Sequence, residues 1–218
     1  MPFPLRRVLD PATEPVSLAD MKNYLRVDYT DDDSLISTLI SAARERAEDI
    51  TGRCLMSQQW QFSMDRFPSY GCFEYLHHRR HRDSMFNLDE RAIILPRGPV
   101  LSVDSIQYVD QITGTLQTLD PSLYIVDNIS EPARITPKYR TTWPLAQFDT
   151  NSVTILFTAG YETIPQSLLH AIKLLVGAWF ENRSEVVQSG GNFNTLPMPI
   201  SASALLGTYT LFPVGYIA

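Results

Sequence analysis

Residues 33–52 read DSLISTLISAARERAEDITG, and this stretch decides the fold. Its apolar residues recur at the spacing of one face of an α-helix: Leu35, Ile36, Leu39, Ile40, Ala43, Ala47 and Ile50. Asp31, Asp32 and Asp33 open the stretch, where carboxylates favour the positive N-terminal end of a helix, and Gly52 suits its C-terminal end. We therefore expect a helix with one apolar stripe that must pack against another element.

A second apolar stripe lies far along the chain and offers that partner. Pro165 suits the start of a helix, and helical spacing follows it at Leu168, Leu169, Ile172, Leu175, Val176, Trp179 and Phe180. A shorter helix is expected from Ser17 to about Arg26, because Ser17 and Asp20 can cap its first turn. Residues 198–206 could form one more short helix.

Between these helical parts the apolar period changes to two, which is typical of strands. The expected strands are Gln58–Met64, Ala92–Leu95, Ser105–Val109, Thr115–Leu119, Leu123–Val126, Ala133–Thr136 and Ser152–Phe157. Turn signals separate them, and no helical pattern intervenes, which indicates an antiparallel β unit.

The predicted fold class is therefore α+β. N- and C-terminal helices form a helical bundle, an antiparallel β unit is inserted between them, and an extended C-terminal tail follows. The expected parts are a helical part at 1–57, the β insertion at 58–160, a long helix at 161–187 that completes the helical part, and a linker and docking tail at 188–218. Residues 189–192, SGGN, are read as a flexible linker.

Composition limits the function classes. The 218 residues carry 24 acidic and 18 basic side chains, a net charge of −6, which argues against a protein that grips duplex DNA by neutralising phosphates. No apolar run approaches a membrane span, and the N-terminus does not resemble a secretory signal. Two cysteines, Cys54 and Cys72, are too few for a disulfide framework or a four-thiolate zinc site, so a reducing compartment is expected.

The C-terminal tail is the most unusual segment, because residues 186–218 contain no Asp, Glu, Lys, Arg or His. Such a tail could pack on its own domain, be disordered, or insert into a groove of another protein. Its dense apolar and aromatic content disfavours disorder and suits docking. The predicted docking residues are Leu205, Leu206, Tyr209, Leu211, Phe212, Val214, Tyr216 and Ile217.

Positive charge concentrates in one short run: His77, His78, Arg79, Arg80, His81 and Arg82. His77 and His81 would share a helix face as metal ligands, but the adjacent arginines disfavour a cation. Contact with DNA phosphates is an alternative, and a solvated loop or a subunit contact is the preferred interpretation. No cofactor or metal is expected.

The charged residues of the 33–52 helix have two interpretations that we hold equal. Arg44, Arg46, Glu48 and Asp49 could form paired contacts at a subunit interface or an ordinary solvated face. No phosphate-binding loop, nucleophile elbow or zinc-protease motif is present, so an enzyme with dispersed catalytic residues is the minority hypothesis. Trp143, which closes the β unit, is expected in a core rather than against a ligand.

An ordered set of short motifs resembles the head–tail connector (adaptor, head-completion) proteins of tailed double-stranded DNA phages. It covers most of residues 15–187 and includes PVSL at 15–18, YLRVD at 24–28, DDSLI at 32–36, TGR at 51–53, QQW at 58–60, LPRGPV at 95–100, FTAGY at 157–161 and WFENR at 179–183.

This resemblance implies a structural virion protein without catalytic residues. Its partners would be further copies of itself in a ring, expected to be dodecameric, the portal protein, and the next neck or tail protein. Double-stranded DNA would pass through without sequence-specific contact, and no membrane is involved. The protein would be made in the host cytoplasm and reside in the virion neck. The alternative function is a DNA-contacting packaging factor that uses the His/Arg run.

Overall fold

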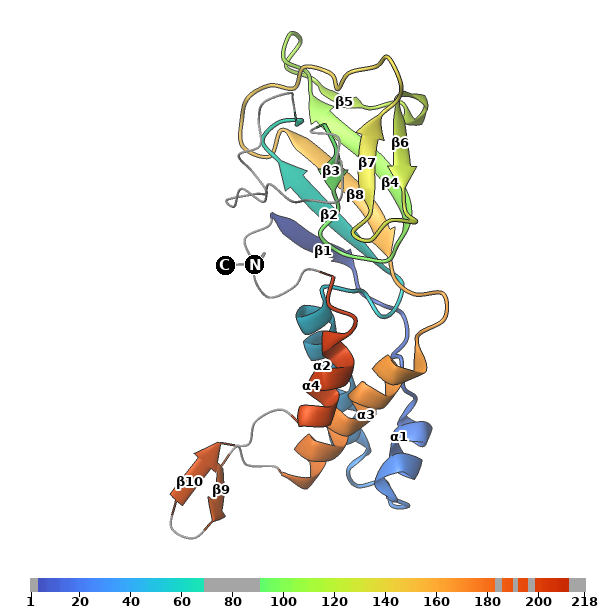
Figure 1. The fold of residues 1–218 in the computed structure, drawn as a ribbon, viewed down its shortest axis with the longest axis vertical. Helices are drawn as coiled ribbons and strands as arrows, with labels where there is room; N and C mark the ends of the chain where they lie inside the picture. The colour runs from blue at the N-terminus through green and yellow to red at the C-terminus, as the bar shows by residue number, and fades with distance from the viewer. Residues whose placement is uncertain (1–3, 69–90, 183–185, 190–191, 196–198, 212–218) are drawn as a thin grey trace. The chain divides into compact units, whose positions relative to one another are not determined.

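The computed structural model describes residues 4–68, 91–182, 186–189, 192–195 and 199–211 (Figure 1). Its secondary structure is mixed, with four α-helices and antiparallel sheets among these residues, so the predicted α+β class is confirmed at that level. The chain divides into two compact units. A helical unit comprises Pro11–Met56 and Tyr161–Thr210, and a β unit comprises Met1–Asp10, Ser57–Gly160 and Leu211–Ala218.

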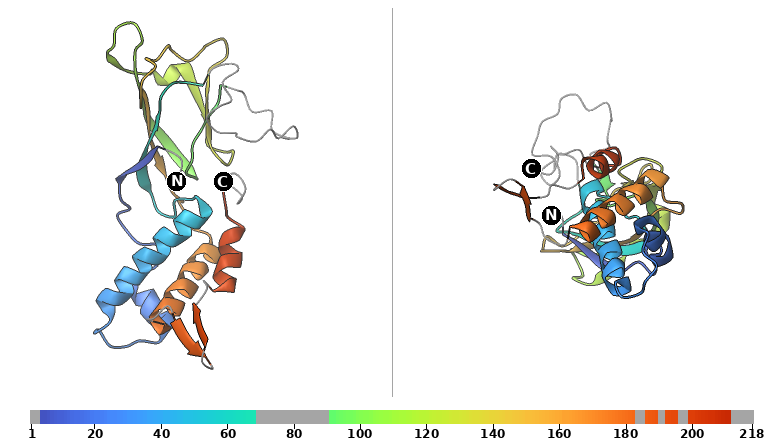
Figure 2. Two further views of the ribbon diagram at one scale, coloured as in Figure 1. Left: turned by 90° about the vertical axis from the view of Figure 1, so that its left-hand side faces the viewer. Right: turned by 90° about the horizontal axis from the view of Figure 1, so that it is seen from below.

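The helical unit contains α1 (Leu18–Leu25), α2 (Asp33–Thr51), α3 (Gln166–Glu181) and α4 (Ile200–Gly207). The predicted caps are present: the Ser17 hydroxyl accepts the backbone N–H of Asp20 at 3.1 Å, and Gly52 ends α2 with a φ of 71°. The long helix α3 packs against α2 on one side and contacts α4 as well, and the three lie side by side in Figures 1 and 2.

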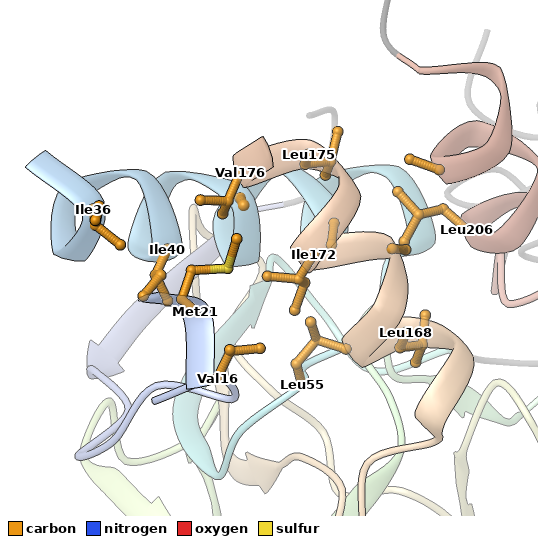
Figure 3. Close-up of a cluster of buried hydrophobic side chains, with 14 residues drawn as sticks. Val16, Met21, Ile36, Ile40, Leu55, Leu168, Ile172, Leu175, Val176 and Leu206 are labelled. Carbon is orange, nitrogen blue, oxygen red and sulfur yellow. The ribbon is translucent and has the colours of Figure 1, made fainter. Parts of the chain in front are cut away.

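The core of the helical unit is made by the two apolar stripes that the sequence predicts (Figure 3). Ile36 and Ile40 of α2 belong to one buried cluster with Leu168, Ile172 and Leu175 of α3, and all five are at most 2% exposed. Other fully buried members come from α1, α4 and the segment after α2, namely Met21, Ala202, Leu206 and Leu55. Burial of apolar surface on this scale is the dominant stabilising term for such a unit.

The β unit contains a five-stranded antiparallel sheet in the order β1-β2-β8-β4-β5. Its strands are β1 (Leu5–Leu9), β2 (Gln58–Met64), β4 (Val100–Val109), β5 (Leu116–Thr118) and β8 (Val153–Ala159). A second sheet, in the order β3-β7-β6, is formed by Ile93–Ile94, Arg134–Pro137 and Tyr124–Asp127, and Figures 1 and 2 show it over one face of the longer sheet. Alternating side chains such as Phe62, Ile155 and Phe157 are buried, as the period of two predicts.

Three features differ from the sequence prediction. Leu5–Leu9 forms an edge strand that pairs with β2, so the first residues of the expected helical part belong to the β unit. Where a flexible linker was expected at 189–192, β9 (Val186–Ser189) and β10 (Asn192–Thr195) pair as antiparallel strands, with Ser189 opposite Asn192. Finally, β4 begins at Val100, five residues earlier than expected.

Candidate functional site

Two of the predicted interface residues are buried within the helical unit. The side chains of Arg44 and Glu48 are 5% and 6% exposed, and Arg44 Nη1 donates to Glu48 Oε2 at 3.1 Å. Arg44 Nε donates to Glu14 Oε2 at 2.9 Å, and Glu48 Oε1 accepts the backbone N–H of Leu55 at 2.9 Å. Burial alone would lower the pKa of Arg44, but the hydrogen bond with Glu14 and the surrounding carboxylates outweigh burial and raise that pKa.

This network corrects the prediction for Arg44 and Glu48. Both groups join α2 to the segments on either side of it, and their burial leaves no surface for a neighbouring subunit. Arg46 and Asp49 lie on the exposed side of α2. Their role at a subunit interface remains a prediction.

The first half of the predicted docking tail packs within the chain, which is the self-packing alternative. Leu206 is fully buried in the helical core, with Leu205 and Tyr209 packed against it. The Tyr209 carbonyl accepts Arg53 Nε at 2.6 Å. Leu211 is 8% exposed. Its side chain packs on Gly98, because a Cβ atom added at that glycine would lie 3.6 Å from it. These four residues therefore have structural roles.

The other predicted tail residues, Phe212, Val214, Tyr216 and Ile217, lie outside the described residues. The same is true of the whole His/Arg run, His77, His78, Arg79, Arg80, His81 and Arg82. Their roles remain predictions.

Trp143 joins the two segments that flank residues 69–90. Its ring stacks on Phe67, with centroids 5.0 Å apart and an interplanar angle of 7°, and its Nε1 donates to the Arg91 carbonyl at 2.7 Å. Trp143 is 9% exposed, which confirms its assignment to a core. Because Phe67 precedes and Arg91 follows the His/Arg run, one tryptophan fixes the chain at both ends of it.

The turn of residues 138–141 lies beside this tryptophan and was not singled out from the sequence. Lys138, Tyr139 and Arg140 are all exposed, and the Arg140 guanidinium carbon lies 5.3 Å from the centroid of the Tyr139 ring. Arg140 adopts a φ of 63°, which no sequence pattern here indicates. Basic side chains around an exposed aromatic ring are suited to contact an anion.

Two hairpin loops of the β unit each present an exposed isoleucine. In the first, Asp110 Oδ1 accepts the backbone N–H groups of Ile112 and Thr113 at 2.9 and 2.7 Å, and Ile112 is 88% exposed. The hydrogen bonds that Asp110 accepts from Thr113 are the largest cause of the lowered pKa of Asp110. The sequence marks this segment only as a turn.

The second loop, between β6 and β7, is held in the same way. Asp127 accepts hydrogen bonds from the Ser130 hydroxyl at 2.8 Å and from Arg134 Nε at 2.8 Å, and Ile129 at the loop is 92% exposed. The hydrogen bonds with Ser130, followed by that with Arg134, lower the pKa of Asp127 to about 2. Both loops are thus ordered without help from a partner and suit a protein contact.

In the part of the chain that the structure describes, no group of three or more His, Cys, Asp or Glu side chains is placed to hold a metal ion. No helix in that part of the chain is both long and apolar enough to cross a membrane.

The segment that contains the first two helices matches a known protein family. Residues 15–69 match the model of the phage gp6-like head-tail connector protein family. This range contains α1, α2 and β2, including Arg44 and Glu48. No curated protein matches the chain.

Solved structures share the fold over nearly the whole chain. A chain in the virion of a native gene transfer agent (GTA) particle aligns with a TM-score of 0.69 at 18% identity and covers 97% of each chain. A chain in the neck of the empty GTA particle, computed with C6 symmetry, has a TM-score of 0.65 at 20% identity over 96% of each. One in the neck of the native particle, computed with C12 symmetry, has 0.62 at 19% over 95% of this chain and 97% of that chain.

These likenesses establish the fold of the chain, and the family match concerns its N-terminal quarter. Together they confirm the resemblance found in the sequence, because residues 15–69 match the model of the phage gp6-like head-tail connector protein family.

Proposed function

We propose that the protein is a head–tail connector of a phage-like particle. It forms a ring beneath the portal, extends the DNA channel, helps to retain the packaged genome and provides the platform for the next neck or tail protein. The observation that carries this proposal is the connector-family match of residues 15–69 together with a shared fold over 97% of a chain from a GTA virion.

Ring assembly is supported by the symmetry of the similar structures, because the GTA particle necks that contain the matching chains were computed with C6 and C12 symmetry. A dodecamer fits both descriptions. In a closed ring each subunit contacts its neighbours through two different surfaces. We assign Arg46 and Asp49 of α2 to one such contact, and Ile112 and Ile129 to contacts of the β unit with a protein neighbour.

Portal docking is assigned to residues 212–218, because they continue the uncharged segment beyond the packed Leu211. A chain truncated after Leu211 keeps Leu206, Tyr209 and Leu211 and is expected to fold normally. It should form the ring yet fail to join the cognate portal protein.

The test images purified full-length protein and the truncated chain by electron microscopy, each alone and mixed with portal. Full-length protein should form closed rings that bind portal, and truncated rings should not. Normal portal binding by the truncated chain would remove the docking assignment. Absence of rings in every sample would remove the proposed function.

A further inference from the structure

The turn of residues 138–141 is held rigidly from several sides. Thr141 N donates to the Lys138 carbonyl at 2.9 Å, and Lys138 N donates to the Leu123 carbonyl at 2.9 Å. The Thr141 hydroxyl donates to the Lys138 carbonyl at 2.6 Å, and Arg91 Nη1 donates to the Thr141 carbonyl at 3.3 Å. The backbone of the turn is therefore fixed before any ligand arrives.

What the turn presents is a cation, an aromatic ring and a second cation in succession. Tyr139 is 83% exposed, Lys138 and Arg140 are exposed on either side of it, and Arg140 lies over the ring. Within the described part of the chain, neither Lys138 nor Arg140 forms an ion pair with a carboxylate. Arg134 of the same unit, by contrast, is paired with Asp127 at 2.8 Å.

The backbone at Arg140 adopts a left-handed conformation that arginine rarely takes. A φ of 63° at the third position of a four-residue turn favours glycine or asparagine, because a side chain in the left-handed region crowds its own backbone. Glycine would form this turn with less strain. Arg26 adopts a similar φ of 58°, so this backbone conformation does not by itself assign a function. The case for Arg140 rests on its exposed side chain beside Lys138 and Tyr139.

We propose that the 138–141 turn binds phosphate groups of duplex DNA, an inference that rests on the proposed function. The Arg140 guanidinium can donate two parallel hydrogen bonds to one phosphate, and Lys138 adds a second positive charge. Two charges per subunit bind weakly, but a duplex is a continuous polyanion that can engage the same turn on every copy in a ring. Because the protein has a net charge of −6, the rest of its surface is not expected to attract the DNA.

The chain supplies a matched control in Arg26, an exposed arginine with a φ of 58° at the end of α1. Arg140→Gly and Arg26→Gly remove the same charge, replace the same residue type and relieve the same kind of backbone strain. Neither substitution should lower the unfolding midpoint. Lys138→Gln serves as a second variant that leaves Arg140 and its backbone unchanged.

The experiment measures binding of a short random-sequence duplex by fluorescence anisotropy at salt concentrations from about 50 to 200 mM. The oligomeric mass of each sample is determined by light scattering. For Arg140→Gly and for Lys138→Gln, the slope of log affinity against log salt should become shallower by about 0.9 for each phosphate that the variant no longer neutralises. Arg26→Gly should bind like the wild type.

Three results would overturn the inference: no duplex binding by the wild type at the lowest salt, wild-type binding by Arg140→Gly, or equal losses in Arg140→Gly and Arg26→Gly. If Arg140→Gly lost portal capture without a change in duplex binding, the ligand of the turn would be an acidic protein surface and not DNA. Rings with turn-independent DNA binding contradict only this inference. Turn-dependent binding by a protein that never forms rings contradicts only the proposed function.

Discussion

Glu48→Ala should strongly destabilise the helical unit. The substitution removes the carboxylate that faces Arg44 at 3.1 Å and accepts the Leu55 N–H at 2.9 Å. It leaves a guanidinium that is 5% exposed and whose remaining carboxylate neighbours, among the described residues, are Glu14 and Glu45. Breaking a buried ion pair from one side costs about 3–5 kcal/mol, which is a large share of the roughly 5–15 kcal/mol that stabilises a typical domain.

Two further variants separate charge from hydrogen bonding. Glu48→Gln keeps an oxygen that can accept the Leu55 N–H, so it should cost less than Glu48→Ala, about 1–3 kcal/mol. Adding Arg44→Met to Glu48→Gln removes the buried guanidinium that has lost one of its carboxylate partners, and should return the free energy of unfolding to within about 1 kcal/mol of the wild type.

The assay is urea unfolding followed by far-ultraviolet circular dichroism, which reports the helical unit because all four described helices belong to it. Glu45→Ala is the matched control, since Glu45 is on the same helix but 54% exposed, and it should cost less than about 1 kcal/mol. A loss below about 1 kcal/mol for Glu48→Ala would refute the reasoning about this network.

Other predictions concern the tail, Trp143 and the loop between β6 and β7. Leu206→Ala should lower the free energy of unfolding by about 2–5 kcal/mol in urea titrations, and a loss near zero would show that α4 is not part of the core. Trp143→Phe keeps the ring stack but removes the Nε1–H, so it should cost about 1–3 kcal/mol and Trp143→Ala more; equal losses would exclude a role for that hydrogen bond. The folded-state pKa of Asp127 is depressed to about 2, so its carboxylate stabilises the fold above the unfolded pKa of about 3.9 and loses this effect as the pH falls toward 2. The difference in melting temperature between the wild type and Asp127→Asn should therefore shrink below a pH of about 4. A difference that stays constant with pH would contradict this. Ile129→Lys should leave the melting temperature unchanged but reduce ring formation in light scattering, and unchanged rings would exclude this loop from the subunit contact.

Local patterns predicted most of the helices and strands, because each depended on periodicity and caps within a few residues. The stripes of α2 and α3, the Ser17 cap and the alternation of β2 are of this kind. The edge strand β1 was missed because its partner β2 lies far along the chain, beyond both α1 and α2. The β9–β10 hairpin was missed although Gly190-Gly191 between short segments is also a hairpin signal.

The site residues were harder to predict, because their roles depend on distant partners. Arg44 and Glu48 were spaced like an ordinary surface pair on a helix, and their burial follows from Glu14 and Leu55, which no helical pattern connects to them. Likewise, nothing in the sequence indicates the left-handed backbone of Arg140. The aspartate that precedes each exposed isoleucine, in contrast, is a readable turn signal.

The measurement that tests the central claim most directly is electron microscopy of the purified full-length protein, alone and with the cognate portal protein. The account predicts closed rings with cyclic symmetry, expected to contain twelve subunits, seated on the portal. Monomers in both samples, or open filaments that never close, would contradict it.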